Sequence, residues 1–204
     1  PSLWDHTKQF MKLHPDYFAS DNLVEFVIDN GDFETSYYNL CHFWSNFEIG
    51  DINFFRSKQY KDYFDYLDKT GGFFYERWGD APVHSIAASL FLNKSQVYHF
   101  KDIGYVHDGM GHCPLGEKQF HENGKCDCNV VDSVTLLEDF CMGDWWFASK
   151  EGKPSEREEY KALIDELELE DVWVEEGEGE GEGEGEGEGQ EDENAGDENL
   201  EVFD

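Results

Sequence analysis

The last thirty residues limit what the rest of the chain can fold into. An alternating glycine and glutamate run opens the stretch 175–204, which holds 15 acidic residues and no lysine or arginine. Such a sequence has no apolar face to bury, and its like charges repel one another. The sequence therefore predicts a disordered acidic tail without a catalytic role at 175–204, and a folded domain within residues 1–174.

The rest of the chain is also acidic. Residues 1–174 carry 32 of the 47 acidic residues and all 15 basic ones, a formal charge of -17. A surface of that sign repels phosphate backbones, so nucleic-acid binding is not expected. A nucleotide-sugar ligand would need a divalent cation between its diphosphate and the protein. Aromatic residues make up 16% of the chain, which favours a packed core or sugar-stacking surfaces.

The cysteines indicate the compartment. An odd number of them leaves at least one thiol free or paired outside the chain. One residue separates Cys126 from Cys128, a spacing that suits neither a zinc knuckle nor a bond between the two. A disulfide network formed in an oxidising lumen is the preferred interpretation, with reduced thiols as the alternative. The five cysteines are Cys41, Cys113, Cys126, Cys128 and Cys141.

Two further features bear on location. The sequon Asn93-Lys94-Ser95 fits a secretory location, although such triplets also occur by chance. The sequence has no apolar stretch long enough to span a bilayer and does not open on a signal peptide. Any membrane attachment is therefore expected through an anchor absent from this chain.

The first half of the folded part predicts helices with short strands between them. Ser2 is expected to cap an amphipathic helix that ends near His14-Pro15, and a second short helix is expected after Asp21. Residues 37–49 are rich in aromatics without helical period, which predicts strand and loop. Asp51 is the expected N-cap of a helix to about residue 68 that ends at Gly71-Gly72. Its expected buried face is Ile52, Phe55, Tyr63 and Leu67.

The second half continues the alternation. Residues 73–78 and 97–100 are expected strands, and residues 102–113 an expected loop. Asp80 is read as an N-cap, with proline in the first turn of a helix to about residue 92. A charged helix is expected at about 155–169. Together these elements predict an α/β layer structure.

Three stretches combine aromatic rings with carboxylates or histidine, at 38–49, 71–85 and 102–107. Aromatic faces stack on the apolar faces of sugars and carboxylates accept hydrogen bonds from hydroxyls, which favours sugar handling. The runs Cys-His-Phe-Trp-Ser-Asn-Phe-Glu-Ile and Gly-Gly-Phe-Phe-Tyr-Glu-Arg-Trp-Gly-Asp-Ala-Pro-Val-His-Ser resemble conserved blocks of the fungal α-1,2-mannosyltransferases of glycosyltransferase family 15. The resemblance covers residues 2–141.

The resemblance implies the C-terminal part of a GT-A domain in the Golgi lumen, belonging to a type II membrane protein. The implied reaction uses GDP-mannose and Mn²⁺ and transfers mannose, with retention, to mannose-terminated O- or N-linked glycans. The family's proposed nucleophile falls on Glu48, an active-site carboxylate on Asp80 and a manganese ligand on His107. Trp44, Arg77 and Trp78 are further candidates for substrate binding.

Each of these residues also has a structural interpretation. Glu48 would be a solvated carboxylate at a strand end, Asp80 a helix cap and His107 a hydrogen-bonded loop histidine. The two tryptophans would pack in the core, and Arg77 would pair with Glu76. His84, in the first turns of a predicted helix, is expected to pack or to form hydrogen bonds.

The sequence departs from the family pattern in two ways. Residues 108–111 read Asp-Gly-Met-Gly where the family usually has proline and aromatic residues, so this loop is expected to be rebuilt. The family's anchor, nucleotide-binding half and acidic metal motif precede the first matched block, so only part of the active site is expected here. The alternative function is a truncated, non-catalytic family member that binds glycans or acts as a lumenal interaction protein.

Overall fold

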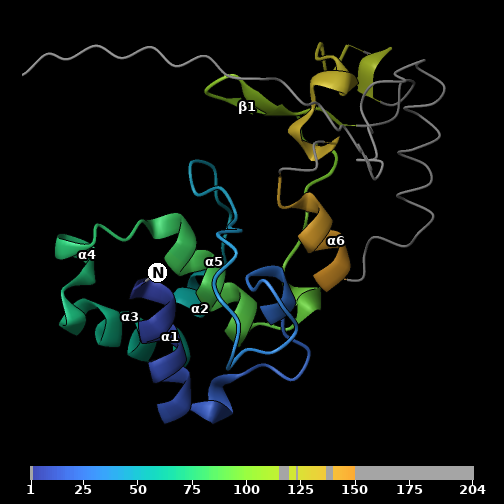
Figure 1. Cartoon of the computed structure of the whole chain (residues 1–204). Coiled ribbons are helices and arrows are strands. Elements are labelled where there is room, and N and C mark those ends of the chain that lie inside the picture. Colours follow the sequence, from blue (N-terminus) through green and yellow to red (C-terminus); the bar gives the residue numbers. More distant parts are fainter. Residues whose placement is uncertain (1, 115–119, 123, 137–139, 150–204) are drawn as a thin grey trace, which may run out of the picture. The chain divides into compact units, whose positions relative to one another are not determined.

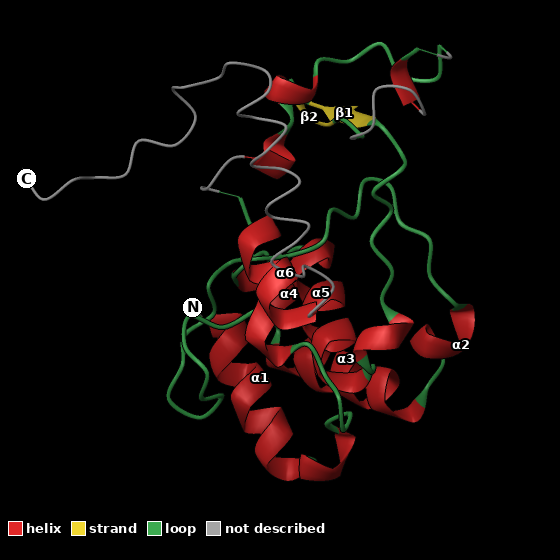
Figure 2. Cartoon of the chain, turned by 90° about the vertical axis from the view of Figure 1, so that its right-hand side faces the viewer, coloured by secondary structure: helices red, strands yellow, loops and turns green. Residues whose placement is uncertain are grey.

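A computed structural model of the chain describes residues 2–114, 120–122, 124–136 and 140–149. The helix expected at 155–169 and the acidic tail at 175–204 lie outside the described residues. The described part is mainly helical, with one two-stranded antiparallel sheet (Figure 2). Among the described helices, none has the length and apolar character needed to cross a bilayer. The predicted α/β layering is therefore replaced, in this part, by helices with one small sheet.

The described elements follow one another in this order, with η marking a 3₁₀ helix: α1 (Ser2–Leu13), η1 (Pro15–Tyr17), η2 (Val24–Phe26), α2 (Ile52–Phe55), α3 (Lys58–Thr70), α4 (Gly72–Tyr75), α5 (Asp80–Phe91), η3 (Lys94–Gln96), β1 (Tyr105–His107), β2 (Met110–His112), η5 (Val130–Asp132), η6 (Val134–Leu136) and α6 (Met142–Ser149).

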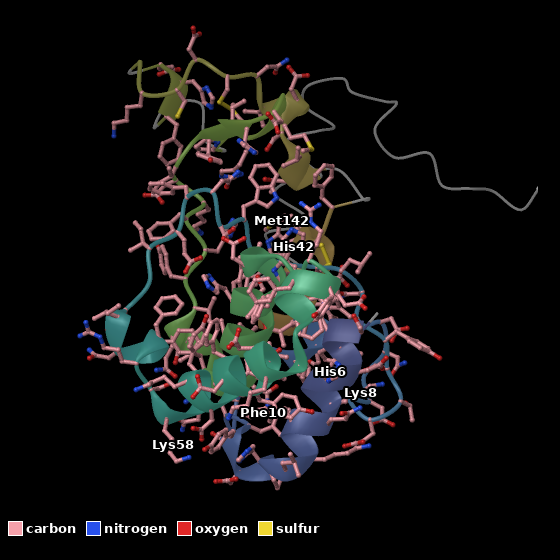
Figure 3. All side chains as sticks on the ribbon, turned by 90° about the vertical axis from the view of Figure 1, so that its left-hand side faces the viewer. His6, Lys8, Phe10, His42, Lys58 and Met142 are labelled. Atoms are coloured by element: carbon pink, nitrogen blue, oxygen red, sulfur yellow. A yellow bond between two sulfur atoms is a disulfide. The ribbon has the colours of Figure 1, made fainter. Side chains whose placement is uncertain are left out.

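The core lies where α3 packs against both α1 and α5 (Figure 1). Helix α1 forms as predicted, because its apolar residues recur at helical spacing, and Leu3, Trp4, Phe10 and Met11 face inward. Phe10, labelled in Figure 3, packs its ring 5.2 Å from that of Tyr63 in α3. The Tyr63 hydroxyl lies 2.7 Å from Thr7 Oγ1, so this fully buried phenol keeps a hydrogen-bond partner.

The single helix expected from Asp51 to residue 68 is two helices. Asp51 caps α2 as predicted, accepting a hydrogen bond from the Asn53 backbone at 2.8 Å. Ser57 then caps α3 by accepting from the Tyr60 backbone at 3.2 Å, because a serine side chain competes well for helix-start amides. As a result Ile52 is exposed. Helix α3 ends where predicted, at Gly71 with φ +76°.

Aromatic runs misled the strand predictions. Residues 73–78 were expected to be extended, but α4 begins directly after Gly71 and the Phe73 ring packs on Trp78. Residues 97–100 form no strand, and residues 37–49 contribute one isolated bridge, Tyr38 to Ile28. Aromatic strand propensity reflects packing on a half-buried surface, and here helices supply that surface.

The segment expected to be a loop, residues 102–113, contains the only sheet of the described residues. Tyr105 of β1 pairs with His112 of β2. The two-residue turn between the strands is Asp108-Gly109, with φ values of +50° and +80°. Asp-Gly is a preferred sequence for such turns, since both central residues need positive φ. The departure from the family pattern at 108–111 therefore forms the hairpin turn and the start of β2.

The cysteines form the predicted disulfide network. Cys41 pairs with Cys141 across 100 residues, and Cys113 pairs with Cys128 across 15. Cys126 keeps a free thiol, as the odd number requires. The long disulfide joins the loop before α2 to the start of α6, whose Met142 is labelled beside His42 in Figure 3.

Helix α5 begins and ends within one residue of the prediction. Gly79 is the N-cap, so Asp80 is the first helical residue rather than the cap itself. A carboxylate in this position still faces the positive end of the helix dipole.

Gly72→Ala tests the packing of α4. Gly72 is buried, and a Cβ there would overlap the indole ring of Trp78. The substitution is expected to lower the free energy of unfolding by about 1–3 kcal/mol, measured by urea denaturation. Gly143→Ala in α6 is the matched control, since a Cβ there meets nothing within 4 Å. It is expected to stabilise the chain by about 0.5–1 kcal/mol. Equal effects at both positions would contradict the packing described.

Candidate active site

Glu48 and His84 form a pair between a loop and a helix. Glu48 lies just before α2, and its Oε2 is 2.9 Å from Nδ1 of His84 in the second turn of α5. The two side chains are 33% and 32% exposed, so solvent and ligands reach both. With the carboxylate oxygen as the acceptor, His84 Nδ1 is the donor of this hydrogen bond.

Asp80 brings a second carboxylate to the same place. It lies one helical turn before His84, so both side chains share a face of α5. A hydrogen bond from Ser45 holds the pKa of the Asp80 carboxyl below its ordinary value, with smaller contributions from backbone amides and from His84. The loop 45–48 thus contacts α5 twice, through Ser45 and through Glu48.

Aromatic rings enclose the pair from the side of α2 and α3. The imidazole of His84 lies 5.3 Å from the ring of Phe55 and 6.1 Å from that of Tyr60. Burial raises the pKa of Tyr60 to about 12, and the negative charges of Glu48 and Asp80 add to this shift. Tyr60 therefore stays protonated beside two carboxylates.

A cavity of about 960 Å³ opens beside Glu48 and His84. This volume is in the range that small organic ligands occupy in proteins. Its lining is more apolar than polar and includes several aromatic rings, among them Trp44, Tyr105 and Trp145. The cavity thus combines one carboxylate–imidazole pair with surfaces on which sugar rings stack.

Trp44 connects this cavity to the hairpin. Its ring contacts the rings of Tyr105 and His107 in β1, edge to face, each at 6.1 Å between centroids. Trp44 lines the cavity, whereas His107 does not. The His107 side chain is 48% exposed, and its Nε2 lies 3.5 Å from Oδ2 of Asp108.

Arg77 and Trp78 lie outside the cavity lining. Arg77 is exposed, with a left-handed φ of +56°. Trp78 donates from Nε1 to Ser2 Oγ at 3.0 Å, and its ring lies 5.5 Å from that of His6. These contacts join the segment before α5 to the start of α1. The substrate-binding roles of both residues stay predictions.

Few described residues are arranged as a metal site. Within the described part of the chain, two groups of three potential ligands lie close together. Each consists of a disulfide and one neighbouring side chain: His121 beside Cys113–Cys128, and Asp144 beside Cys41–Cys141. Sulfurs bonded to each other are not thiolate ligands. His107 and Asp108 offer one imidazole and one carboxylate, donors that a manganese ion accepts. They fit the predicted role of His107 as one ligand among oxygen donors, and they supply too few ligands to hold an ion by themselves.

From the sequence, His84 was expected to pack or to form hydrogen bonds, and its pairing with Glu48 was not predicted. The spacing of Asp80 and His84 on a predicted helix was the available signal, since residues four apart share a face. Ser45 and Tyr60 were not singled out. No local pattern connects them with α5, because the contacts bridge separate elements.

The chain is similar to known proteins in sequence and in structure. The family model described as glycolipid 2-alpha-mannosyltransferase matches residues 1–150. The glycolipid 2-alpha-mannosyltransferase 2 of Candida albicans is 50% identical over 161 residues, covering 79% of this chain and 34% of the relative. The O-glycoside alpha-1,2-mannosyltransferase homolog 3 of Schizosaccharomyces pombe is 51% identical over 145 residues, covering 71% and 38%.

Two solved structures are similar as well. The mannosyltransferase Ktr4p of Saccharomyces cerevisiae, in complex with GDP, matches with a TM-score of 0.62 and 38% identity over 72% of this chain and 39% of that one. Core-mannan synthase A of Aspergillus fumigatus, in its Mn/GDP form, gives a TM-score of 0.60 and 38% identity, covering 73% and 41%. The chain spans about a third to two fifths of the length of these relatives.

Proposed function

Because the chain belongs to the glycolipid 2-alpha-mannosyltransferase family, we propose that it forms the C-terminal part of a GT-A domain that transfers mannose from GDP-mannose. The transfer retains the α configuration, and the acceptors are mannose-terminated O- or N-linked glycans. Relatives named as α-1,2-mannosyltransferases support the reaction, and solved relatives holding GDP and manganese support the donor and the metal. The observation that carries the proposal is the Glu48–His84 pair beside the cavity.

Glu48 is the proposed catalytic carboxylate. In the reaction the bond from the mannose anomeric carbon to the diphosphate oxygen breaks and GDP leaves. A bond from that carbon to the acceptor oxygen forms, the O–H bond of the acceptor breaks, and its proton is released. A carboxylate on the face of the mannose ring opposite the diphosphate has two possible roles. It either forms a covalent intermediate with the anomeric carbon, or stabilises the positive charge that develops there while the acceptor attacks. Both routes end with retention. Ionised Asp80, one turn along α5 from His84, adds negative charge to the same region.

His84 is the proposed positioning residue. Its Nδ1–H donates to Oε2 and leaves Oε1 of Glu48 available to the sugar. Phe55 and Tyr60 hold the imidazole ring in place from the other side. A carboxylate fixed in this way reaches the reacting carbon with little reorganisation, which is how active sites gain rate from geometry.

The remaining predicted residues have secondary roles in this proposal. Trp44 offers a stacking face at the cavity, and Arg77 and Trp78 would contact substrate only from outside the lining described. Manganese, when bound, would neutralise the charge of the departing diphosphate, with His107 as a ligand. The proposed setting is the Golgi lumen in a type II membrane protein, and the two disulfides favour such an oxidising compartment. Residues 175–204 are proposed to lie outside the catalytic domain.

The test is mannosyl transfer by a hybrid transferase. In this hybrid, residues 2–149 of the chain replace the matching segment of the Schizosaccharomyces pombe relative, and the unmodified relative is the control. Transfer to methyl α-mannoside by the folded hybrid would support the proposal. A hybrid that melts cooperatively and binds GDP-mannose, yet transfers nothing, would favour the alternative of a non-catalytic, glycan-binding family member.

Two substitutions of His84 distinguish positioning from simple packing. Asn carries its amide nitrogen where His carries Nδ1, whereas Gln carries it one bond further out. His84→Gln is expected to lower kcat of the hybrid by about 10²-fold with KM for GDP-mannose little changed, because Glu48 loses its orientation. His84→Asn is expected to keep kcat within about tenfold of the parent, since the donor to Oε2 remains. Equal losses in the two variants would show that Nδ1 donation does not matter.

A further inference from the structure

Asn93 lies on the surface connection that follows α5. Asn93-Lys94-Ser95 is the only Asn-X-Ser/Thr triplet of the sequence, and proline neither occupies its middle position nor follows it. The triplet opens η3, where Ser95 is exposed and Asn93 is half-buried. Leu92 and Gln96, on either side, line the large cavity, whereas Asn93 does not. The triplet therefore belongs to the outer surface rather than to the candidate active site.

The hydrogen bonds of Asn93 fix the orientation of its amide. Its Oδ1 accepts from the backbone nitrogen of Asp21 at 3.1 Å. The neighbouring Lys94 backbone nitrogen donates to the Asp21 carbonyl at 2.7 Å, and Gln96 Oε1 accepts from the Asn93 backbone nitrogen at 2.9 Å. The carboxamide is planar, so Nδ2 points away from Asp21 when Oδ1 points toward it. Oδ1 therefore forms the structural hydrogen bond to Asp21, and Nδ2 is the atom of the amide at which a modification can occur.

We propose that Asn93 carries an N-linked glycan. The donor is an oligosaccharide held on a lipid diphosphate. A bond forms between Nδ2 and the anomeric carbon, the bond from that carbon to the diphosphate oxygen breaks, the lipid diphosphate leaves, and one Nδ2 proton is released. The product keeps Oδ1 as an acceptor, so the contact with Asp21 survives the modification. The Ser95 hydroxyl is the part of the acceptor triplet that the modifying enzyme recognises.

The disulfides supply an independent argument for this modification. Cys41–Cys141 and Cys113–Cys128 form in oxidising compartments, which are also where N-glycosylation takes place. A triplet in such a chain meets the modifying enzyme during synthesis, and Ser95 stays exposed in the folded chain. This inference does not rest on the transferase proposal, because it uses neither Glu48 nor the cavity.

The experiment follows the full 204-residue chain through a eukaryotic secretory pathway behind a cleavable signal peptide. Secreted and microsomal fractions are both collected and treated with the amidase that releases N-glycans and converts the modified asparagine to aspartate. The expected result is a faster-migrating band after treatment, with Asp at position 93 in the peptide mass spectrum. Ser95→Ala should run at the treated position before any treatment, and Ser95→Thr should keep the shift.

Ser95 is the substituted residue because its side chain is exposed and Asn93 then keeps its bond to Asp21. Loss of the shift in Ser95→Ala therefore reports loss of the acceptor triplet and not loss of a structural contact. An unmodified Asn93 peptide in both fractions of the parent chain would overturn the proposal. So would a shift that persists in Ser95→Ala.

Discussion

Glu48→Gln is expected to lower kcat and kcat/KM of the hybrid transferase together, by about 10³-fold or more. Gln keeps the size of the side chain and an oxygen that accepts from His84 Nδ1. It lacks the negative charge that bonds to, or stabilises, the anomeric carbon in the transition state. Binding of GDP-mannose, measured by calorimetry with manganese present, should change little, because the charge acts mainly after the bond to GDP begins to break.

Glu76→Gln is the matched control for this substitution. Glu76 is also exposed, but its Oε2 accepts from Ser2 Oγ at 3.2 Å, at the start of α1 and outside the cavity lining. Its replacement should leave transfer unchanged. If Glu48→Gln keeps transfer within tenfold of the parent and melts at the same temperature, Glu48 is not the catalytic carboxylate and the site must be assigned elsewhere.

Removing the long disulfide is expected to cause the largest loss of stability. The Cys41–Cys141 bond closes a loop of 100 residues, and the chain-entropy model assigns such a loop about 4.7 kcal/mol. The Cys113–Cys128 bond closes 15 residues, for which the same model gives about 3 kcal/mol. Double serine substitution of Cys41 and Cys141 should therefore lower the free energy of unfolding more than double serine substitution of Cys113 and Cys128. Urea denaturation of the 204-residue chain measures both differences.

The free thiol provides the control for this comparison. Cys126→Ser removes sulfur without opening a loop and is expected to change stability by less than about 0.5 kcal/mol. Cys41 is buried beside α6, so loss of its disulfide should also loosen the lining around Met142. A smaller loss from the Cys41–Cys141 pair than from the Cys113–Cys128 pair would show that loop closure does not govern the stability of this fold.

The parts of the fold that were predicted well are those whose sequence signal lies within the element itself. Helix α1 has an apolar stripe, Asp51 and Gly71 are recognisable cap residues, and α5 has a proline in its first turn. The hairpin also had a local signal, Asp108-Gly109, which the comparison with the family pattern obscured. The strand predictions at 73–78 and 97–100 failed because aromatic residues suit any packed surface, and the neighbouring surfaces here are helical.

Two carboxylates of the candidate site were named from the sequence, but their arrangement was not predicted. The resemblance pointed to Glu48 and Asp80, and the structure places both beside His84. They are joined by the contact of loop 45–48 with α5, in which Glu48 and His84 are 36 positions apart along the chain. Sequence periodicity does not predict a contact between such distant segments. The pairing of Cys41 with Cys141 is equally non-local, since spacing alone does not select partners.

The most direct test of the transferase account is the structure of the product that the hybrid makes from GDP-mannose and methyl α-mannoside with manganese present. NMR of the purified disaccharide reports both the linkage position and the anomeric configuration. The account predicts an α-1,2-linked product, lost when Glu48 is replaced by Gln. A folded hybrid that makes no disaccharide, or one with a β linkage, would contradict it.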